Sequence, residues 1–239
     1  MNVIFNTRND PLQLAEHLAN DVSDRINKSI ARNGRAVVAL SGGSTPKPFF
    51  AALAKKDIDW SRVIITLVDE RWVDETHELS NAAFMRRHLL NALNPRVRFV
   101  PLYFPLGKVE ESYDMVLKNY CEATESTTQA PRNFDVVVLG MGKDGHTASF
   151  FPDADNINEL VDIKNNRPLH ACHSPTTQVQ RITWSIKMLL NSSFLVLHYT
   201  GQEKKQVFDR AKTAGSHTEL PIRSVIFQDH VPLNVYYAD

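Results

Sequence analysis

The sequence has little cysteine, no excess of charge of either sign and no long apolar run. Cys121 and Cys172 are the two cysteines among 239 residues. Two thiols are too few for a disulfide framework, and this agrees with a reducing compartment. Lysine plus arginine number 27 and aspartate plus glutamate number 27. Net charge therefore gives no reason to expect nucleic acid or an anionic membrane as a partner, and any anion site must be local.

The chain also lacks targeting and membrane signals. Its first residues, MNVIFNTRNDP, do not show a basic start followed by an apolar core and a small-residue cleavage site, so no secretory signal is predicted. No apolar run approaches the roughly 20 residues that a membrane-spanning helix needs. We therefore expect a cytoplasmic protein without a membrane partner. The hydrophobic fraction of 43% is enough for a sizeable core.

Apolar segments of strand length alternate with segments of helical periodicity over nearly the whole chain. The pattern predicts strands at 3–5, 35–40, 63–68, 97–101, 134–139, 169–173, 191–198, 224–227 and 235–237, and helices at 10–33, 45–56, 80–93, 110–125 and 204–212. Such alternation is typical of an α/β fold with a mainly parallel sheet. Without an internal repeat or a linker, residues 1–239 are expected to form a single domain. The oligomeric state, monomer or small homo-oligomer, stays open.

A glycine-rich loop follows the predicted strand at 134–139, in the stretch FDVVVLGMGKDGHTASFFP. Its glycines let the chain turn sharply at the carboxyl end of the strand and present Asp144 and His146, at the edge where open α/β sheets bind ligands. The same glycines match a dinucleotide-binding pattern. That pattern needs a long helix after the third glycine, whereas Pro152 follows within two turns. Taken alone, the loop fits a displayed functional histidine or an ordinary turn whose histidine caps a backbone group.

A second loop, after the predicted strand at 35–40, is dense in hydrogen-bond donors. It consists of Ser41, Gly42, Gly43, Ser44, Thr45 and Pro46. Glycines let backbone N–H groups approach an oxyanion, hydroxyls donate further bonds, and the following helix terminus adds positive potential. The alternative is an ordinary strand-to-helix turn with a Ser or Thr cap. The density of donors favours a phosphate site, although no Gly-Lys-Ser/Thr of the Walker type follows.

Charged residues follow a third predicted strand directly. Asp69, Glu70 and Arg71 come after the strand at 63–68, and they are either functional or part of a salt-bridged surface turn. Three strands ending in polar clusters favour a converging site. His170 and His173 do not indicate a metal site, because residues three apart on a strand point to opposite faces and zinc sites need more ligands.

Four stretches together carry a family resemblance: SGGSTP at 41–46, DERWV at 69–73 with Ser80-Asn81 behind it, GMGKDGHTASFFP at 140–152, and Arg181-Ile182-Thr183 followed by GQEK at 201–204. In order and spacing the chain resembles the 6-phosphogluconolactonases, whose family also contains the glucosamine-6-phosphate isomerases. The likeness spans almost the full length. It implies a three-layer, Rossmann-like fold with a parallel central sheet. It also implies hydrolysis of 6-phospho-D-glucono-1,5-lactone in the pentose phosphate pathway, with no required metal or organic cofactor.

The resemblance also implies roles for residues of this chain. It makes His146 the general base, with Asp144 and Asp69 shaping the hydrogen bonds around His146 and the bound sugar. It assigns the phosphate to Arg181, Lys204 and the loop Ser41, Gly42, Gly43, Ser44 and Thr45, with Arg71 as a further candidate. Phosphate and lactone carbonyl would thus bind at one site.

Two other functions remain open at this point. An aldose-ketose isomerase or deaminase of the same family has an acidic residue five positions after the loop histidine, where this chain has Phe151. A non-catalytic sugar-phosphate sensor would keep the phosphate residues but would need no intact Asp144-Gly145-His146, and it would usually add a DNA-binding or partner module. One departure from the relatives is Lys47-Pro48, where apolar residues are more frequent.

Overall fold

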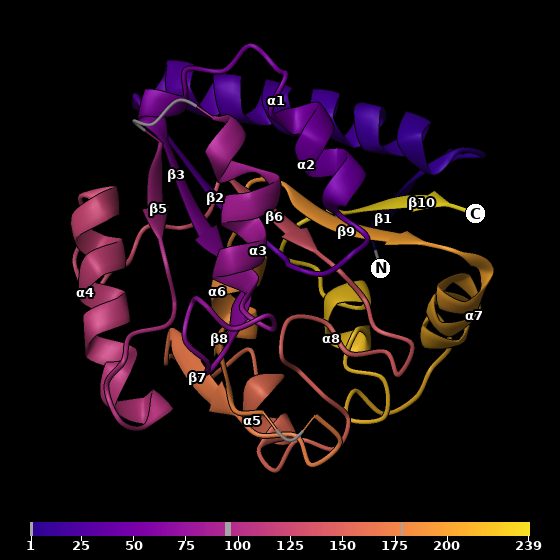
Figure 1. The fold of residues 1–239 in the computed structure, drawn as a ribbon. Coiled ribbons are helices and arrows are strands. Elements are labelled where there is room, and N and C mark those ends of the chain that lie inside the picture. Colours follow the sequence, from indigo (N-terminus) through magenta and orange to yellow (C-terminus); the bar gives the residue numbers. More distant parts are fainter. Residues whose placement is uncertain (1, 94–96, 178) are drawn as a thin grey trace.

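The centre of the protein is a seven-stranded sheet in which every neighbouring pair of strands is parallel, in the order β1-β10-β9-β6-β2-β3-β5 (Figure 1). The computed structural model describes residues 2–93, 97–177 and 179–239. The strands are β1 (Val3–Arg8), β2 (Ala36–Leu40), β3 (Val63–Leu67), β5 (Arg98–Val100), β6 (Val136–Leu139), β9 (Leu195–Thr200) and β10 (Leu233–Ala238). The predicted α/β fold with a parallel central sheet is confirmed.

Helices cover both faces of this sheet. They are α1 (Pro11–Asn33), α2 (Lys47–Leu53), α3 (Asn81–His88), α4 (Tyr113–Thr124), α5 (Ile157–Leu160), α6 (Ile186–Leu190), α7 (Gln202–Ala211) and α8 (Arg223–Ile226). In Figure 1, α1 and α2 lie along the top, and α7 and α8 lie lower on the right. Two adjacent residues of β9 point to opposite faces of the sheet. The His198 ring meets Phe49 of α2 on one face, and the Tyr199 ring stacks on Phe208 of α7 on the other.

The long helix α1 has the ends that its sequence predicts. Asp10 caps it, because its side chain accepts a hydrogen bond from the Leu12 backbone N–H at 2.9 Å. Gly34 ends it in the left-handed conformation, with φ 77°, and its N–H bonds to the Ile30 carbonyl. The buried face of α1 packs on the large sheet and on α2. No helix among the described residues is both long and apolar enough to cross a membrane.

A second, small antiparallel sheet was not anticipated. It contains β4 (Asp69–Arg71), β8 (Arg181–Trp184) and β7 (Leu169–Cys172), in the order β4-β8-β7. Residue Val68 alone separates β3 from β4, so the chain passes directly from the large sheet into the small one. The polar cluster Asp69-Glu70-Arg71 therefore forms a strand and not a surface turn, and its register places Arg71 opposite Arg181.

One expectation for the second half of the chain was wrong. Residues 224–227 do not close the sheet, because Arg223–Ile226 form the short helix α8. The β-branched residues there are buried, but Pro221 precedes them and the Ile222 N–H bonds to the Gly145 carbonyl, which holds the segment away from any strand edge. The segment 154–166, polar and acidic in sequence, is mostly exposed or half-buried, and it includes α5, whose Ile157 and Leu160 are buried.

Candidate active site

The loop between β2 and α2 is tied to the glycine-rich loop after β6. The Ser41 N–H donates to the Val138 carbonyl at 3.0 Å, and the Gly140 N–H donates to Ser41 Oγ at 3.3 Å. Gly42 lies against the side chain of Asn81, and a Cβ at position 42 would overlap that amide. Only glycine fits there, so the loop can pass close beneath the start of α3.

His146 is held by its own loop. The Gly142 N–H donates to the His146 carbonyl at 2.9 Å, and the turn at Gly145 takes φ 80°, a conformation that favours glycine. The ring of His146 lies on the ring of Phe151, with 4.3 Å between centroids. This local framework presents a half-buried imidazole to the space at the carboxyl edge of the sheet.

The Asp144 carboxylate orients this imidazole. Asp144 Oδ1 lies 2.6 Å from His146 Nδ1 and also accepts the His146 backbone N–H at 3.2 Å. Burial acts to raise the pKa of Asp144, but the hydrogen bonds and charge of His146 outweigh it and hold this pKa below its usual value. A neutral imidazole facing an ionised carboxylate keeps its proton on Nδ1. His146 Nε2 is then free to accept a proton.

Asp69 lies in β4, on a different side of the site. Its carboxylate accepts a hydrogen bond from Ser149 Oγ at 2.5 Å and lies 3.9 Å from Arg181 Nη1. The Arg181 guanidinium also lies over the Phe151 ring, 4.7 Å from its centroid. Asp69 is therefore linked to His146 indirectly: it lies near Arg181, which lies over Phe151, which in turn contacts the imidazole. Asp144 contacts His146 directly.

Arg71 of β4 and Arg181 of β8 lie opposite each other in the small sheet. The Arg181 side chain is 11% exposed, and burial lowers its pKa, partly offset by the charge of Asp69. Arg71 donates from Nη1 to the Leu79 carbonyl at 2.7 Å. The Nε of each arginine is buried and has no partner among the described residues. Both arginines also line one pocket, where their guanidinium charge suits an anion.

Lys204, in the first turn of α7, faces the loop at residues 41–46 from the other side. Its Nζ lies 3.4 Å from Thr45 Oγ1. Burial lowers the pKa of Lys204, and the nearby charge of Lys143 lowers it further. No carboxylate forms an ion pair with Lys204 in the part of the chain that the structure describes, although Glu203 beside it pairs with Lys143. An anion in the pocket would supply the missing countercharge.

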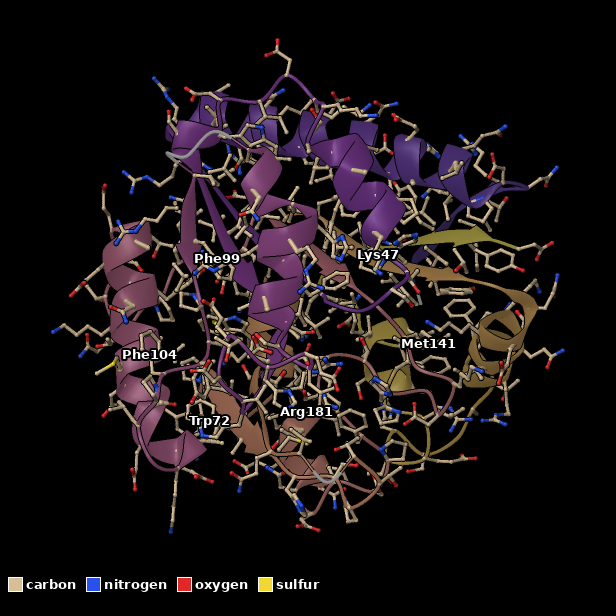
Figure 2. All side chains as sticks on the ribbon, viewed as in Figure 1. Lys47, Trp72, Phe99, Phe104, Met141 and Arg181 are labelled. Atoms are coloured by element: carbon tan, nitrogen blue, oxygen red, sulfur yellow. The ribbon has the colours of Figure 1, made fainter. Side chains whose placement is uncertain are left out.

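These groups line one pocket of about 240 Å³ at the carboxyl edge of the large sheet. Figure 2 labels two of its lining residues, Arg181 of β8 and Met141 of the loop after β6. The structure brings together most of the residues singled out in the sequence, namely Ser41, Gly42, Gly43, Ser44, Thr45, Asp69, Arg71, His146, Arg181 and Lys204. Asp144 does not line the pocket and acts on it through His146. The described residues contain no group of three or more His, Cys, Asp or Glu able to hold a metal ion.

Sequence reasoning named Glu70 and Asn81 but did not predict that they support this site. Glu70 is fully buried and accepts the backbone N–H groups of Asn81, Ala82 and Arg71 at 2.7, 2.7 and 2.8 Å. Burial raises the pKa of Glu70 to about 7, against the lowering effect of those donors. The Asn81 amide donates to the Asp69 carbonyl at 2.9 Å. The signal available in the sequence was the helix cap Ser80-Asn81, which begins ten residues after Glu70.

Fold and site together define an α/β protein with a cationic, donor-rich pocket at the carboxyl edge of a parallel sheet. An imidazole that is paired with a carboxylate lines this pocket. A family profile described as "Glucosamine-6-phosphate isomerases/6-phosphogluconolactonase" matches residues 9–233. The chain belongs to this family.

Individual relatives agree with this assignment. The 6-phosphogluconolactonase of Mesorhizobium japonicum is 40% identical over 237 residues, which cover 98% of this chain and 94% of that protein. The one from Rhizobium meliloti is 39% identical over 229 residues, covering 96% of each. The crystal structure of a 6-phosphogluconolactonase from Shewanella baltica superposes with a TM-score of 0.91 at 34% identity, covering 99% of this chain and 98% of that one. The resemblance found in the sequence is confirmed.

Proposed function

We propose that this protein hydrolyses 6-phospho-D-glucono-1,5-lactone to 6-phospho-D-gluconate, with water activated by His146. The observation that carries the proposal is that the His146–Asp144 pair opens into the same pocket as Arg181, Lys204 and the donor-rich loop. One pocket therefore offers a base for water and a site for a phosphate. The relatives at 39–40% identity over nearly the whole chain support the same reaction.

The chemistry divides between the two ring nitrogens of His146. The Nε2 atom takes a proton from water as the water oxygen bonds to the lactone carbonyl carbon, and the carbonyl oxygen becomes an oxyanion. Collapse of this intermediate breaks the bond to the ring oxygen, and the imidazolium returns its proton there. Asp144 holds Nδ1–H throughout, fixes the orientation of the ring and stabilises the imidazolium.

The phosphate group takes no part in bond making and serves as a handle. Arg181, Lys204 and the loop at residues 41–45 supply charge and donors for it, with Arg71 beside Arg181. Binding energy at this end orients the carbonyl against the water and His146. Asp69 accepts from Ser149 and stands by Arg181, so we assign it to holding that guanidinium and a sugar hydroxyl.

Isomerisation is not supported by the residues around His146. An isomerase of this family needs an acid/base group five positions after the loop histidine, and here Phe151 stacks on the imidazole. A phenyl ring can exchange no proton with a sugar. The proposal takes residues 1–239 as one catalytic domain, which agrees with the pairing of β1 with β10 in one sheet. It also includes a cytoplasmic location, in keeping with two buried, free thiols.

The test is an assay on freshly prepared 6-phospho-D-glucono-1,5-lactone, with spontaneous hydrolysis subtracted. We expect a rate proportional to protein concentration, with gluconate 6-phosphate as the product. In parallel, glucosamine 6-phosphate is offered as a substrate for deamination. A protein that deaminates glucosamine 6-phosphate but leaves the lactone at its spontaneous rate would overturn the proposal.

A further inference from the structure

A buried histidine that the proposed mechanism does not use lies in the floor of the pocket. His198 is the fourth residue of β9 and lines the cavity together with the loop at residues 41–46 and Lys204. The residue before it, Leu197, pairs with Leu139 at the end of β6. His198 therefore lies level with the start of the glycine-rich loop, at the carboxyl edge where the ligand binds.

The ring is held in place by packing rather than by hydrogen bonds. It meets Phe49 edge to face, with 6.3 Å between centroids and 75° between planes. The residue is 4% exposed, and no side-chain hydrogen bond or ion pair joins it to any other residue that the structure describes. His198 lines the pocket, so its small exposed part faces that space.

An unpartnered polar ring this deeply buried needs an explanation, because buried polar groups normally have hydrogen-bond partners. A partner supplied by the ligand would satisfy it. The residues around His198 indicate which part of the ligand this is. Phe49 lies in the first turn of α2, three positions after the donor-rich loop ends, and Lys204 bonds to Thr45 of that loop. Both neighbours belong to the phosphate end of the pocket.

We infer that His198 is a further substrate-binding residue, whose ring N–H donates a hydrogen bond to the phosphate group of the ligand from beneath the loop at residues 41–46. The inference rests on the proposed function and adds a neutral donor to a site otherwise supplied with cations.

A neutral donor suits this position. Burial, together with the charge of Lys204, lowers the pKa of His198 to about 4. The ring is therefore uncharged near neutral pH and keeps one N–H. A hydrogen bond from a neutral donor to a dianion is strengthened by the charge of the acceptor. It also adds no further cation beside Lys204 and Lys143, whose mutual repulsion already lowers the pKa of Lys204.

Two substitutions separate the hydrogen bond from the packing. His198→Phe keeps an aromatic ring against Phe49 and removes both nitrogens, whereas His198→Gln keeps a neutral N–H donor. The matched control is His173→Phe, an exposed histidine paired with Asp155 outside the pocket. The melting temperature of each variant is recorded, and the dissociation constant of inorganic phosphate is measured by calorimetry, which needs no turnover.

We expect His198→Phe to weaken phosphate binding by about tenfold, the usual effect of losing one hydrogen bond to a charged group. The value of kcat/KM for the phosphorylated lactone should fall by a similar factor, while the unphosphorylated lactone is unaffected. His198→Gln should recover most of the loss, and His173→Phe should match wild type. Phosphate binding within twofold of wild type in His198→Phe, or equal losses on both lactones, would overturn the inference.

A measurement on the wild-type protein covers the case in which a variant does not fold. With ¹⁵N-labelled histidine, the His198 signals should be those of a neutral imidazole, and they should shift on titration with inorganic phosphate. Signals that stay unmoved at saturating phosphate would contradict the inference. A protein that binds phosphate through His198 but does not hydrolyse the lactone would refute the proposed function alone.

Discussion

The two ends that we propose for the pocket, one catalytic and one for the phosphate, are built in different ways. The catalytic end is local: Asp144 and His146 are two residues apart, and Phe151 under the imidazole belongs to the same loop. The phosphate end is assembled from remote parts of the chain, and the contact between Lys204 and Thr45 joins positions 159 residues apart. The chemistry therefore depends on one loop, whereas the handle depends on the correct packing of two sheets and α7.

The largest effect should come from breaking the catalytic end. His146→Ala removes the base, and we expect kcat to fall by about 10²- to 10⁴-fold. Because the loss concerns the water and the carbonyl, the phosphorylated and unphosphorylated lactones should suffer alike. Steady-state kinetics on both substrates, corrected for spontaneous hydrolysis, measure it.

His173→Ala provides the control, since His173 also pairs with an aspartate but lies outside the pocket. It should leave the kinetics unchanged. A His146→Ala protein within a few-fold of wild type would remove His146 from the role of base.

Breaking the phosphate end should give a smaller and selective loss. Replacing Arg181 or Lys204 by alanine removes charge-assisted hydrogen bonds worth roughly 1.5 to 3 kcal/mol each, so kcat/KM for the phosphorylated lactone should fall at least about tenfold. The unphosphorylated lactone lacks the dianion and should be hydrolysed as before.

Lys205→Ala is the matched control for Lys204, because Lys205 pairs with Asp209 and does not line the pocket. Equal losses on the two substrates in the Lys204 variant would assign that residue to stability instead of phosphate binding.

A third experiment concerns the support of the phosphate end. The pKa of Glu70 is raised to about 7 in the folded protein by burial. A carboxyl whose pKa is higher in the folded state binds protons more tightly there. Its contribution to stability is complete below the unfolded pKa of about 4.5 and is lost as pH rises through about 7. Between about pH 5 and pH 7 this loss is roughly 2 kcal/mol.

Glu70→Gln cannot titrate and should lack this part of the pH dependence. Urea denaturation of wild type and variant at a series of pH values gives the difference directly. Glu122→Gln, an exposed residue of α4, is the control and should keep the wild-type slope. Parallel stability curves for wild type and Glu70→Gln would show that Glu70 does not titrate in this range.

The last experiment, removal of metal ions, should not change the rate. Chelators should leave the rate unchanged, because neither end of the pocket offers a set of metal ligands among the described residues. Activity is measured before and after treatment with EDTA and dialysis. Loss of activity that zinc or magnesium restores would show that a metal takes part.

The sequence alone predicted several features that depend on near neighbours. Asp10 and Gly34 mark the ends of α1. The apolar runs of β2, β3 and β6 predict buried parallel strands, and the turns after them predict a site at one edge. The Asp144–His146 contact also lies within reach of a short loop. These features follow from backbone preferences and residue periodicity, which act over a few positions.

Tertiary structure decided what depends on distant partners. The antiparallel pairing of β4 with β8 places Arg71 opposite Arg181, 110 positions later in the chain, and no local pattern specifies that register. Residues 224–227 have the composition of a strand, yet the contact of Ile222 with Gly145 places them in α8. In the sequence, His198 follows a run of apolar residues and gives no sign of a binding role. It lines the pocket because β9 ends beside β6 and beneath α2. Partner choice in a sheet is set by burial and packing of the whole fold, so these contacts exist only once the chain has folded.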